Sequence, residues 1–319
     1  MIHRIPNGTR DVLPTEMGEL RRMTERIRAV FDAAGYGEVY TPALEYESEV
    51  VRAGGARPAY RMFDEHGNVL VLRSDMTVPI ARLVATRYAS REPPLRFCYF
   101  AHAYRGVRPQ RGQSREFLQA GVELIGAPAP AGTAEAVTVL CRALGAVGLK
   151  DYRVGLGDVS LYPALLESCG VPAETREVIL ADLARGDFVG VEHQLEQLGL
   201  GENEADLLLR VPRMRGGPEI LDGLTGRLQE AGTGMLDVLA LLGPEIAERV
   251  IFDFGLVRSL GYYTGAVFQV YDPAHGVPLG GGGGYDELLG QFGRSLPAVG
   301  FALNVERLHI ALAGEERGL

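Results

Sequence analysis

One short segment near the middle of the chain combines residue types and spacing that suit the binding of a small ligand. Its apolar residues Leu118, Ala120, Val122 and Leu124 alternate with Gln119, Gly121 and Glu123. Successive side chains of a β-strand point to opposite faces of a sheet, so one face is apolar and the other carries an amide, a gap and a carboxylate. The polar face suits a small ligand that bears an amine. The alternative is a solvent-exposed face of an antiparallel sheet.

A second group of candidate residues is cationic. Arg105, Arg108, Arg111 and Arg115 fall in and around one connection that also contains glycine, proline and serine. Guanidinium groups donate forked hydrogen bonds to carboxylates and phosphates, so this density of arginine favours contact with anionic groups of a ligand or partner. Arg105 stands at the end of an expected strand and is the one expected to point into a cleft. A solvated surface loop is the alternative.

Two segments nearer the C-terminus are also suggestive. The run Gly280–Gly284 permits close approach of the backbone to a ligand, because glycine has no side chain. A flexible hairpin turn is the alternative for this run. Before it, Arg258, Tyr262 and Tyr263 place a cation beside two aromatic hydroxyls on a connection that leads into an expected strand.

Elements that position these residues follow from the spacing of apolar side chains. Apolar residues at three- and four-residue steps predict an amphipathic helix between Thr15 and Gly35. Alternating runs predict a hairpin of strands 95–104 and 115–125 with the arginine-rich connection at its tip. Further strands are expected at 38–43, 68–73, 152–156, 250–254, 264–271, 277–282 and 297–303, and further helices through Ile80, over 134–147 and over 304–312.

Strands at both ends of the chain surround a helical middle. From 162 to 246 the apolar spacing is almost wholly helical. This order predicts an α+β fold in which one antiparallel sheet, flanked by helices, is assembled from both halves of the sequence. The expected division is a core of residues 1–160 and 248–319, with a helical insertion over 161–247.

Composition narrows the class of protein. The chain has 319 residues, of which 46% are hydrophobic and 23% charged, as in a globular protein with a sizeable core. The formal net charge of −9 repels polyanions, so we expect no nucleic-acid partner. No apolar run is long enough to span a membrane, and the N-terminus has no signal-like apolar region. We therefore expect a cytoplasmic protein with no membrane partner.

The cysteines and histidines do not suggest a metal centre. Cys98, Cys141 and Cys169 are widely spaced, and no pair forms a C-x-x-C motif. The six histidines show none of the short spacings that build a zinc or iron site. We expect reduced thiols in the core, no metal and no cofactor. The one lysine, Lys150, is not part of a phosphate-binding loop.

Four long segments, in this order, resemble the catalytic core of the histidyl-tRNA synthetase family. NGTRDVLP with VYTPALE resembles the start of the core and motif 1, which forms the dimer interface in that family, and YRGVRPQRGQSREFLQAGVELIG resembles motif 2 with the following strand. LVRSLGYYTG resembles the histidine-specific loop, and PAVGFALNVERL resembles motif 3. The resemblance covers nearly the whole chain and implies the class II aminoacyl-tRNA synthetase fold.

The resemblance also implies the roles of particular residues. It makes Asp75, Thr77, Gln119, Glu123, Arg258, Tyr262 and Tyr263 the set that binds histidine. Arg105 and Arg307 correspond to the arginines that clamp the ATP phosphates in the synthetases, and would be vestigial here. No catalytic residue is assigned.

Departures from the synthetase pattern bear on function. Val107 stands where the family has a glutamate that reads the adenine amine, and valine accepts no hydrogen bond. Gly284 replaces an arginine, Asn304 a glycine and Gly261 an aspartate. No segment resembling an anticodon-binding domain follows motif 3 in this sequence, so we expect poor binding of tRNA.

This combination is similar to the synthetase relatives that serve as regulatory subunits of ATP phosphoribosyltransferase in the first step of histidine biosynthesis. It implies a homodimer within a hetero-octamer that also contains the short-form catalytic subunit, with free histidine as a ligand. The chain would activate that subunit and mediate its inhibition by histidine. The alternative is a truncated synthetase-like enzyme that forms histidyl-adenylate. A binding module that reuses the fold for another partner has no supporting segment.

Overall fold

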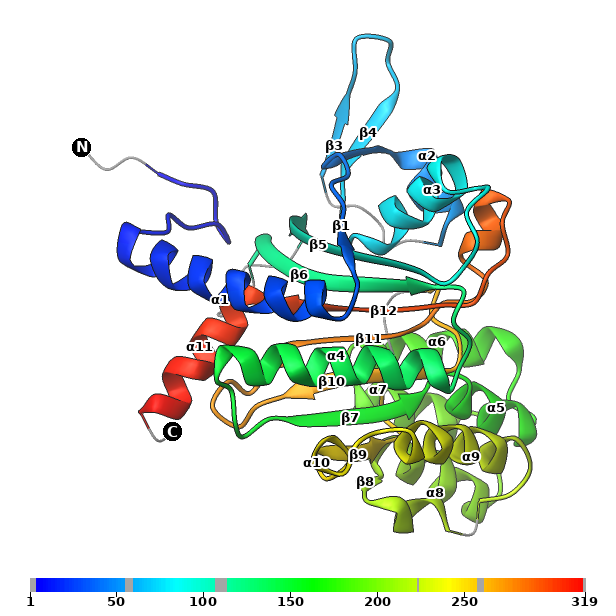
Figure 1. Ribbon diagram of the computed structural model, residues 1–319. Coiled ribbons are helices and arrows are strands. Elements are labelled where there is room, and N and C mark those ends of the chain that lie inside the picture. The colour runs from blue at the N-terminus through cyan, green and yellow to red at the C-terminus, as the bar shows by residue number, and fades with distance from the viewer. Residues whose placement is uncertain (1–3, 55–59, 107–113, 223, 257–260, 318–319) are drawn as a thin grey trace.

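The computed structural model describes residues 4–54, 60–106, 114–222, 224–256 and 261–317 (Figure 1). Its main sheet has nine strands in the order β1-β5-β6-β12-β11-β10-β7-β9-β8. These strands are β1 (Gly37–Glu38), β5 (Leu95–Tyr104), β6 (Glu116–Ile125), β7 (Arg153–Asp158), β8 (Arg215–Gly216), β9 (Val250–Asp253), β10 (Ala266–Tyr271), β11 (Gly280–Gly284) and β12 (Ala298–Asn304).

The middle of this sheet is antiparallel and joins the two halves of the sequence, as expected. β6 pairs with β5 on one side and with β12, far along the chain, on the other. The pairs β1–β5 and β7–β9 are parallel, so the sheet is antiparallel at its centre and mixed towards its edges. The short parallel strands add on at the two sides, where a connection through a helix returns the chain in the same direction.

A second sheet of three strands lies apart from the first, which the expectation of a single sheet did not include. It contains β2 (Leu44–Tyr46), β4 (Val69–Leu72) and β3 (Arg61–Phe63) in that order. The strand expected at 38–43 is therefore wrong as one element: β1 ends at Glu38 and β2 begins at Leu44. Pro42 lies between the two, and proline has no N–H to contribute to a ladder.

The glycine run is a central strand and not a hairpin turn. β11 lies between β10 and β12. A Cβ added at Gly282 would stand 2.8 Å from both the Cα and the Cβ of Phe301 on β12. Because real Cβ atoms do not approach this closely, the register of β11 and β12 requires glycine there. The strand expected over 277–282 thus lies slightly later in the chain, on the glycines themselves.

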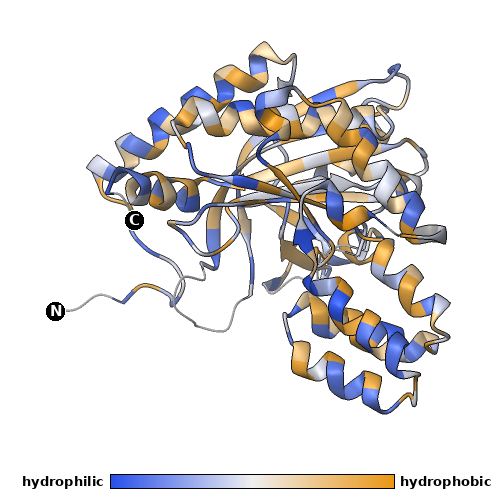
Figure 2. Cartoon of the chain, turned by 90° about the horizontal axis from the view of Figure 1, so that it is seen from below, coloured by the Kyte–Doolittle hydropathy of each residue, from blue (hydrophilic) through white to orange (hydrophobic). Residues whose placement is uncertain are grey.

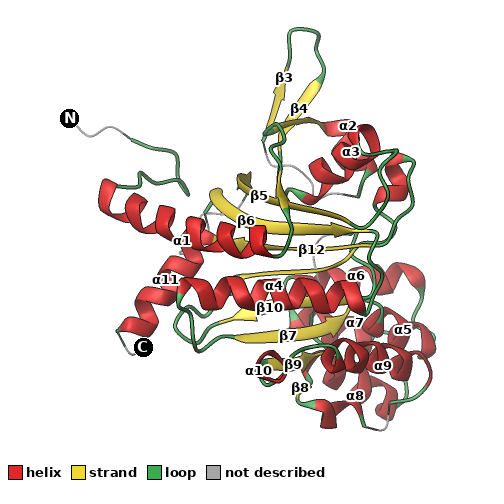
Figure 3. Cartoon of the chain, in the orientation of Figure 1, coloured by secondary structure: helices red, strands yellow, loops and turns green. Residues whose placement is uncertain are grey.

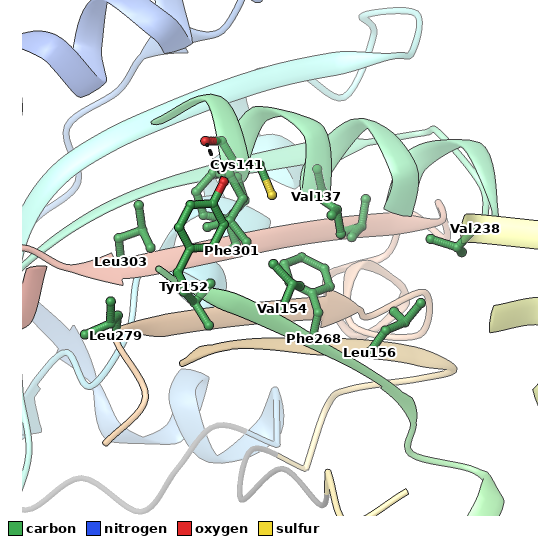
Figure 4. Packing of buried hydrophobic residues seen from close by; sticks show 14 of the residues in the cluster. Val137, Cys141, Tyr152, Val154, Leu156, Val238, Phe268, Leu279, Phe301 and Leu303 are labelled. Carbon is green, nitrogen blue, oxygen red and sulfur yellow. Dashed lines mark hydrogen bonds between the residues drawn. The ribbon is translucent and has the colours of Figure 1, made fainter. Parts of the chain in front are cut away.

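Long helices cover one face of the main sheet. These are α1 (Pro14–Ala33), α4 (Ala131–Val147) and α11 (Val305–Glu316); in Figure 1 α1 and α4 lie in front of the strands, and α11 lies at the left-hand end of the sheet beside α1. α4 packs on the sheet through fully buried residues such as Leu140 and Leu144. Figure 4 shows Val137 and Cys141 of α4 above Val154, Phe268 and Phe301 of three strands.

The opposite face of the sheet has its own, smaller core. α3 (Thr77–Arg87) supplies Ile80 and Val84, which pack with Phe97 of β5, Ala298 of β12 and Tyr285. The helix α2 (Glu47–Arg52) contacts β2 and β4 of the small sheet, and the 3₁₀ turn η3 (Leu289–Phe292) contacts α3. This face carries the polar side chains of β6.

The middle of the sequence is helical, as the apolar spacing predicts (Figure 3). Its elements are α5 (Leu161–Ser168), α6 (Ala173–Ala184), α7 (Phe188–Glu196), α8 (Glu202–Arg210), η1 (Val211–Arg213), η2 (Pro218–Leu221), α9 (Gly226–Ala240) and α10 (Pro244–Ala247), with β8 among them. Buried residues of this region, including Leu165 and Met235, belong to one hydrophobic cluster with Val154 and Leu156 of β7. The division into 1–160, 161–247 and 248–319 stays a prediction.

Apolar and polar residues are interspersed along the helices (Figure 2). No helix in the described ranges is both long and apolar enough to cross a membrane. Within the same ranges Cys98 and Cys141 are buried free thiols, and Cys169 is a half-buried one.

Candidate functional site

A cavity of about 920 Å³ lies against the main sheet, and Glu16 in the first turn of α1 is among the residues that border it. Strands β5, β6, β11 and β12 contribute to it, as do the start of α3, the residues before β10, the N-terminal segment and α11. Of the residues predicted for a site, it is bordered by Asp75, Thr77, Arg105, Gln119, Tyr262, Tyr263 and Arg307. The fold therefore brings five of the seven residues predicted to bind histidine, and both predicted arginines, to one cavity.

Strand β6 places its amide and carboxyl groups as the alternation predicts. Ala120, Val122 and Leu124 are fully buried on the side of α1 and α4, while Gln119 and Glu123 face the cavity side. Gln119 is 5% exposed and Glu123 is 1% exposed. The solvent-exposed alternative for this face is therefore wrong, because α3 and Tyr285 cover it.

Gln119 carries an unsatisfied acceptor at the cavity wall. Its Oε1 atom is buried and has no hydrogen-bond partner among the residues that the structure describes. Buried acceptors without partners cost free energy and are rare in native proteins. This oxygen is available to an N–H donor of a ligand.

Glu123 lies beneath the wall and is held by two hydroxyl groups. Thr77 donates from Oγ1 to Oε1 of Glu123 over 2.8 Å, and Tyr285 donates its hydroxyl to Oε2. Burial raises the pKa of Glu123 to about 8, the negative charge of Asp75 adds to this rise, and the two hydroxyl donors oppose it. The carboxyl group is therefore mainly protonated near neutral pH.

Asp75 is oriented by local contacts at the start of α3. Its Oδ1 accepts from the backbone N–H of Val78 at 3.2 Å, and its Oδ2 accepts from Ser74 Oγ at 3.1 Å. An aspartate before the first turn of a helix satisfies a free N–H group there and is favoured by the helix dipole. Asp75 is thus a fixed carboxylate beside the buried end of the cavity.

The gap expected over Gly121 is filled. A Cβ added at Gly121 would stand 2.5 Å from Cζ of Tyr99, and the Tyr99 hydroxyl lies closer still. β5 pairs Tyr99 directly with Gly121, so the aromatic ring of one strand occupies the space that the glycine of the other leaves. The seat predicted above Gly121 is therefore wrong, and glycine serves close packing of Tyr99.

Tyrosine rings form the aromatic part of the buried end of the cavity. The ring centroids of Tyr262 and Tyr263 are 5.0 Å apart, and those of Tyr262 and Tyr285 are 6.0 Å apart. Burial raises the pKa of Tyr99, Tyr262 and Tyr285 well above the ordinary value, so their hydroxyls stay neutral. Arg258, predicted for the same set, lies outside the described residues.

The two predicted phosphate-binding arginines lie near each other at the cavity. Arg307 donates from Nη1 to the carbonyl oxygen of Pro278 at 2.7 Å, and the guanidinium carbon of Arg105 stands 5.1 Å from the ring centroid of Phe117. Burial lowers the pKa of Arg307, and the charge of Arg105 lowers it further. His275 also borders the cavity, and burial lowers its pKa. This end of the cavity thus carries two guanidinium groups, and Glu306 is also close enough to act on Arg307.

Two of the departures from the synthetase pattern have visible structural effects. Asn304 caps α11, since its Oδ1 accepts from the backbone N–H of Arg307 at 2.9 Å, and it borders the cavity. A Cβ at Gly284 would stand 2.8 Å from the carbonyl oxygen of Thr264, so a side chain there requires the backbone to shift. Val107 lies outside the described residues, and Gly261 does not border the cavity.

Several residues at the cavity were not predicted. Tyr99 and Gly300 became visible only through strand pairing, which sets Tyr99 beside Gly121 and Gly300 beside Glu123. Tyr285 became visible only through its hydrogen bond to Glu123. His102, Glu116, Gln269, His275 and Glu306 also border the cavity. The alternation along β5 could have indicated that Tyr99 and His102 point to opposite faces of the sheet. No three His, Cys, Asp or Glu residues in the described ranges are grouped so as to hold a metal ion.

Comparison with known proteins agrees with this architecture. A family model described as histidyl-tRNA synthetase matches residues 8–308. The chain is 43% identical to a protein of Symbiobacterium thermophilum named ATP phosphoribosyltransferase regulatory subunit, over 99% of this chain and 81% of that protein. A Bacillus halodurans structure described as an ATP phosphoribosyltransferase regulatory subunit/histidyl-tRNA synthetase has a TM-score of 0.87 and 32% identity, over 98% of this chain and 84% of that one.

A second similar solved structure carries the name of a synthetase subunit. A histidine–tRNA ligase subunit from Alicyclobacillus acidocaldarius has a TM-score of 0.84 and 30% identity, over 99% of both chains. The class II synthetase-like fold is confirmed by these structures. The chain belongs to the family of ATP phosphoribosyltransferase regulatory subunits, which share the fold of histidyl-tRNA synthetase.

Proposed function

We propose that this chain is a non-catalytic regulatory subunit that binds and activates a short-form ATP phosphoribosyltransferase and makes it sensitive to free histidine. Its partner transfers the phosphoribosyl group of phosphoribosyl pyrophosphate to ATP. Histidine binds at the buried end of the cavity of this chain. The assembly is a hetero-octamer that contains homodimers of this chain.

One observation carries the histidine part of the proposal. The Oε1 atom of Gln119 is buried, has no partner within the described part of the chain, and lies at the wall of a cavity that Asp75 also borders. Histidine offers N–H donors from its ammonium group and its imidazole ring, and it needs acceptors of this kind. Asp75 supplies the charge for the ammonium group, and Gln119 and the tyrosine hydroxyls supply neutral contacts.

In this proposal the negative charge at the cavity wall comes from Asp75. Glu123, which was also expected to face histidine, therefore has a different role. Glu123 is 1% exposed and its two oxygens accept from Thr77 and Tyr285, so a ligand meets those hydroxyls first. Glu123 stays in the proposed set together with Thr77, Tyr262, Tyr263 and Arg258. Its contribution is indirect.

The end of the cavity that contains Arg105 and Arg307 gives less support to the alternative, a synthetase-like enzyme. Arg105 and Arg307 are retained, but Asn304 occupies part of the wall where the synthetases have glycine, and Gly284 removes an arginine. A synthetase that has lost one charge-assisted contact loses about 1.5–3 kcal/mol, or roughly ten- to a hundredfold in affinity. Two such losses, of an arginine at Gly284 and of a glutamate at Val107, support loss of adenylate formation.

The test of the proposed function is reconstitution. The full chain is mixed with a short-form ATP phosphoribosyltransferase, and formation of the phosphoribosyl-ATP product is followed with and without histidine. We expect co-purification, a higher rate than the catalytic subunit shows alone, and inhibition by histidine. A catalytic subunit that is equally active and equally inhibited without this chain would refute the proposal.

A parallel assay separates the enzymatic alternative. The full chain is given ATP, labelled pyrophosphate and histidine, and label entering ATP is measured. We expect no exchange above a reaction without protein. Histidine-dependent exchange of pyrophosphate into ATP would instead establish that the chain is an enzyme that forms histidyl-adenylate.

A further inference from the structure

Two amide side chains, those of Asn304 and Gln119, lie side by side on the wall of the cavity. The antiparallel register of β12 and β6 sets Asn304 directly opposite Gln119, and both residues border the cavity. Leu303, the residue before Asn304, is fully buried in the cluster on the side of α4 (Figure 4). Because side chains alternate along a strand, Asn304 faces the cavity. Side chains directly opposite each other have Cβ atoms about 5 Å apart, so one small ligand can contact both amides.

The first turn of α11 fixes the orientation of the Asn304 amide. Its Oδ1 accepts from the backbone N–H of Arg307 at 2.9 Å. A backbone N–H only donates, so the amide atom that it meets is the oxygen, and the other atom is Nδ2. No residue that the structure describes accepts a hydrogen bond from Nδ2. Asn304 therefore offers the cavity a donor and keeps its acceptor for the helix.

The neighbouring strands leave this row of the sheet to the two amides. On the far side of Gln119, β5 contributes Ala101, whose side chain is apolar. On the far side of β12 lies β11, which has glycine at every position. The row therefore presents one acceptor, the buried Oε1 of Gln119 that has no partner among the described residues, and one donor, Nδ2 of Asn304.

An acceptor beside a donor matches the two charged groups that a free α-amino acid carries on one carbon atom. The ammonium group only donates hydrogen bonds and the carboxylate only accepts them. Along β6, Glu123 lies towards the buried end of the cavity from Gln119, and Phe117, which Arg105 covers, lies towards the other end. The two amides thus stand between the two ends. A ligand whose side chain enters the buried end has its ammonium and carboxylate groups at this row.

Resting on the proposed function, we propose that Asn304 determines specificity by donating from Nδ2 to the α-carboxylate of free histidine. Gln119 Oε1 and Asp75 receive the ammonium group on the other side of the same carbon atom. The site then takes an amino acid whose carboxylate is free. A derivative in which that carboxylate is converted to an amide has no negative charge at this place, so it makes a weaker hydrogen bond with Nδ2.

Calorimetric titration of the full chain with histidine and with histidinamide tests this role. Asn304→Asp keeps the size of the side chain and the oxygen that caps α11, and it replaces the donor with a charged acceptor. The dissociation constant for histidine is expected to rise at least tenfold, because a charge-assisted hydrogen bond is lost and two carboxylates meet. The constant for histidinamide is expected to stay or fall, since its amide N–H can donate to the new carboxylate. Each ligand is compared between chains, so differences in the ionisation of the ligands cancel.

Two further variants complete the comparison. Asn203→Asp makes the same chemical change on the exposed face of α8, and both ligands are expected to bind it as they bind the wild-type chain. Asn304→Gly removes the donor without adding charge, and glycine is tolerated at the start of a helix. In Asn304→Gly the preference for histidine over histidinamide is expected to shrink roughly tenfold or more.

The results separate this inference from the proposed function. Equal loss of affinity for both ligands in Asn304→Asp would overturn the role of Asn304 alone, because the carboxylate would then not be what the side chain recognises. An unchanged dissociation constant for histidine in both Asn304 variants would do the same. Absence of histidine binding to the wild-type chain would overturn the proposed function and the specificity role with it.

Discussion

At the scale of single residues, Asp75 and Glu123 are two carboxyl groups at the buried end of the cavity, and burial raises the pKa of Glu123. Both groups lie at one end of the cavity, and they differ in surroundings. Asp75 accepts a backbone N–H and borders the cavity, whereas Glu123 is covered by Thr77 and Tyr285. This division of roles yields two predictions.

The first prediction concerns stability against pH. The folded chain holds the proton of Glu123 more tightly than the unfolded chain, with a pKa of about 8 against 4.5. This contribution to the free energy of unfolding is therefore fully present below about pH 4.5 and is lost as pH rises through about 8, by about 1.4 kcal/mol per pH unit at most. Urea unfolding between pH 5 and 8 should show a flatter decline for Glu123→Gln. Equal slopes for the two chains would contradict this.

The second prediction concerns histidine affinity. Asp75→Asn removes the charge opposite the ammonium group of the ligand at nearly constant size. A charge-assisted hydrogen bond contributes about 1.5–3 kcal/mol, so the dissociation constant for histidine should rise roughly ten- to a hundredfold. Calorimetry measures it, with Asp206→Asn on the exposed face of α8 as the control. An unchanged constant in Asp75→Asn would place the ammonium group elsewhere.

At the scale of elements, the central strand β11 is made of glycine because its neighbours leave no room for side chains. The antiparallel register sets Gly282 beside Phe301, and an added Cβ would meet the backbone of β12. In contrast, Gly145 lies on the exposed side of α4, with no atom within 4 Å of an added Cβ. Glycine is therefore required in the first position and only tolerated in the second.

Two alanine substitutions test this contrast. Gly282→Ala should destabilise the chain by about 1–3 kcal/mol, as overpacking of a core does. Gly145→Ala should stabilise it by roughly 0.5–1 kcal/mol, because alanine favours the helical conformation. Thermal or urea unfolding of both variants gives the comparison. If Gly282→Ala were as stable as the wild-type chain, β11 would not pack against β12 as closely as described.

At the scale of the whole molecule, large apolar side chains gather around the small sheet β2-β4-β3. Tyr40 is 83% exposed before β2 and Phe63 is 75% exposed on β3, and Leu44 and Tyr46 on β2 are also exposed. Exposed apolar patches of this kind favour protein–protein contact. They lie in and beside the segment around Pro42 that resembles the dimer interface of the synthetase family, which agrees with the homodimer we propose.

The prediction at this scale is a dimer that depends on that segment. Light scattering of the wild-type chain at micromolar concentration should give twice the mass of one chain, and Tyr40→Lys should shift it towards one chain, because a buried charge opposes association. Val189→Lys is the matched control, since Val189 is 78% exposed on α7, far along the chain from the segment. A wild-type monomer, or equal effects of both substitutions, would count against this interface.

The sequence by itself determined the class of fold and part of the set of residues that border the cavity. Alternation along β6 was enough to set Gln119 and Glu123 on the face opposite Ala120 and Val122, because the two-residue period of a strand is a local property. The order of the motif-like segments determined the synthetase-like architecture, which the solved relatives confirm. Local patterns also located the helical middle of the chain.

Tertiary structure alone decided how that face is used. Tyr99 fills the gap over Gly121, and Tyr285, 162 residues from Glu123, donates to its carboxyl group. The depth at which Glu123 is buried, and therefore its protonation, depends on strands and helices that meet only in the folded chain. Burial and cross-strand register arise from contacts between distant segments, so a local pattern indicates the face of a residue but not what covers it.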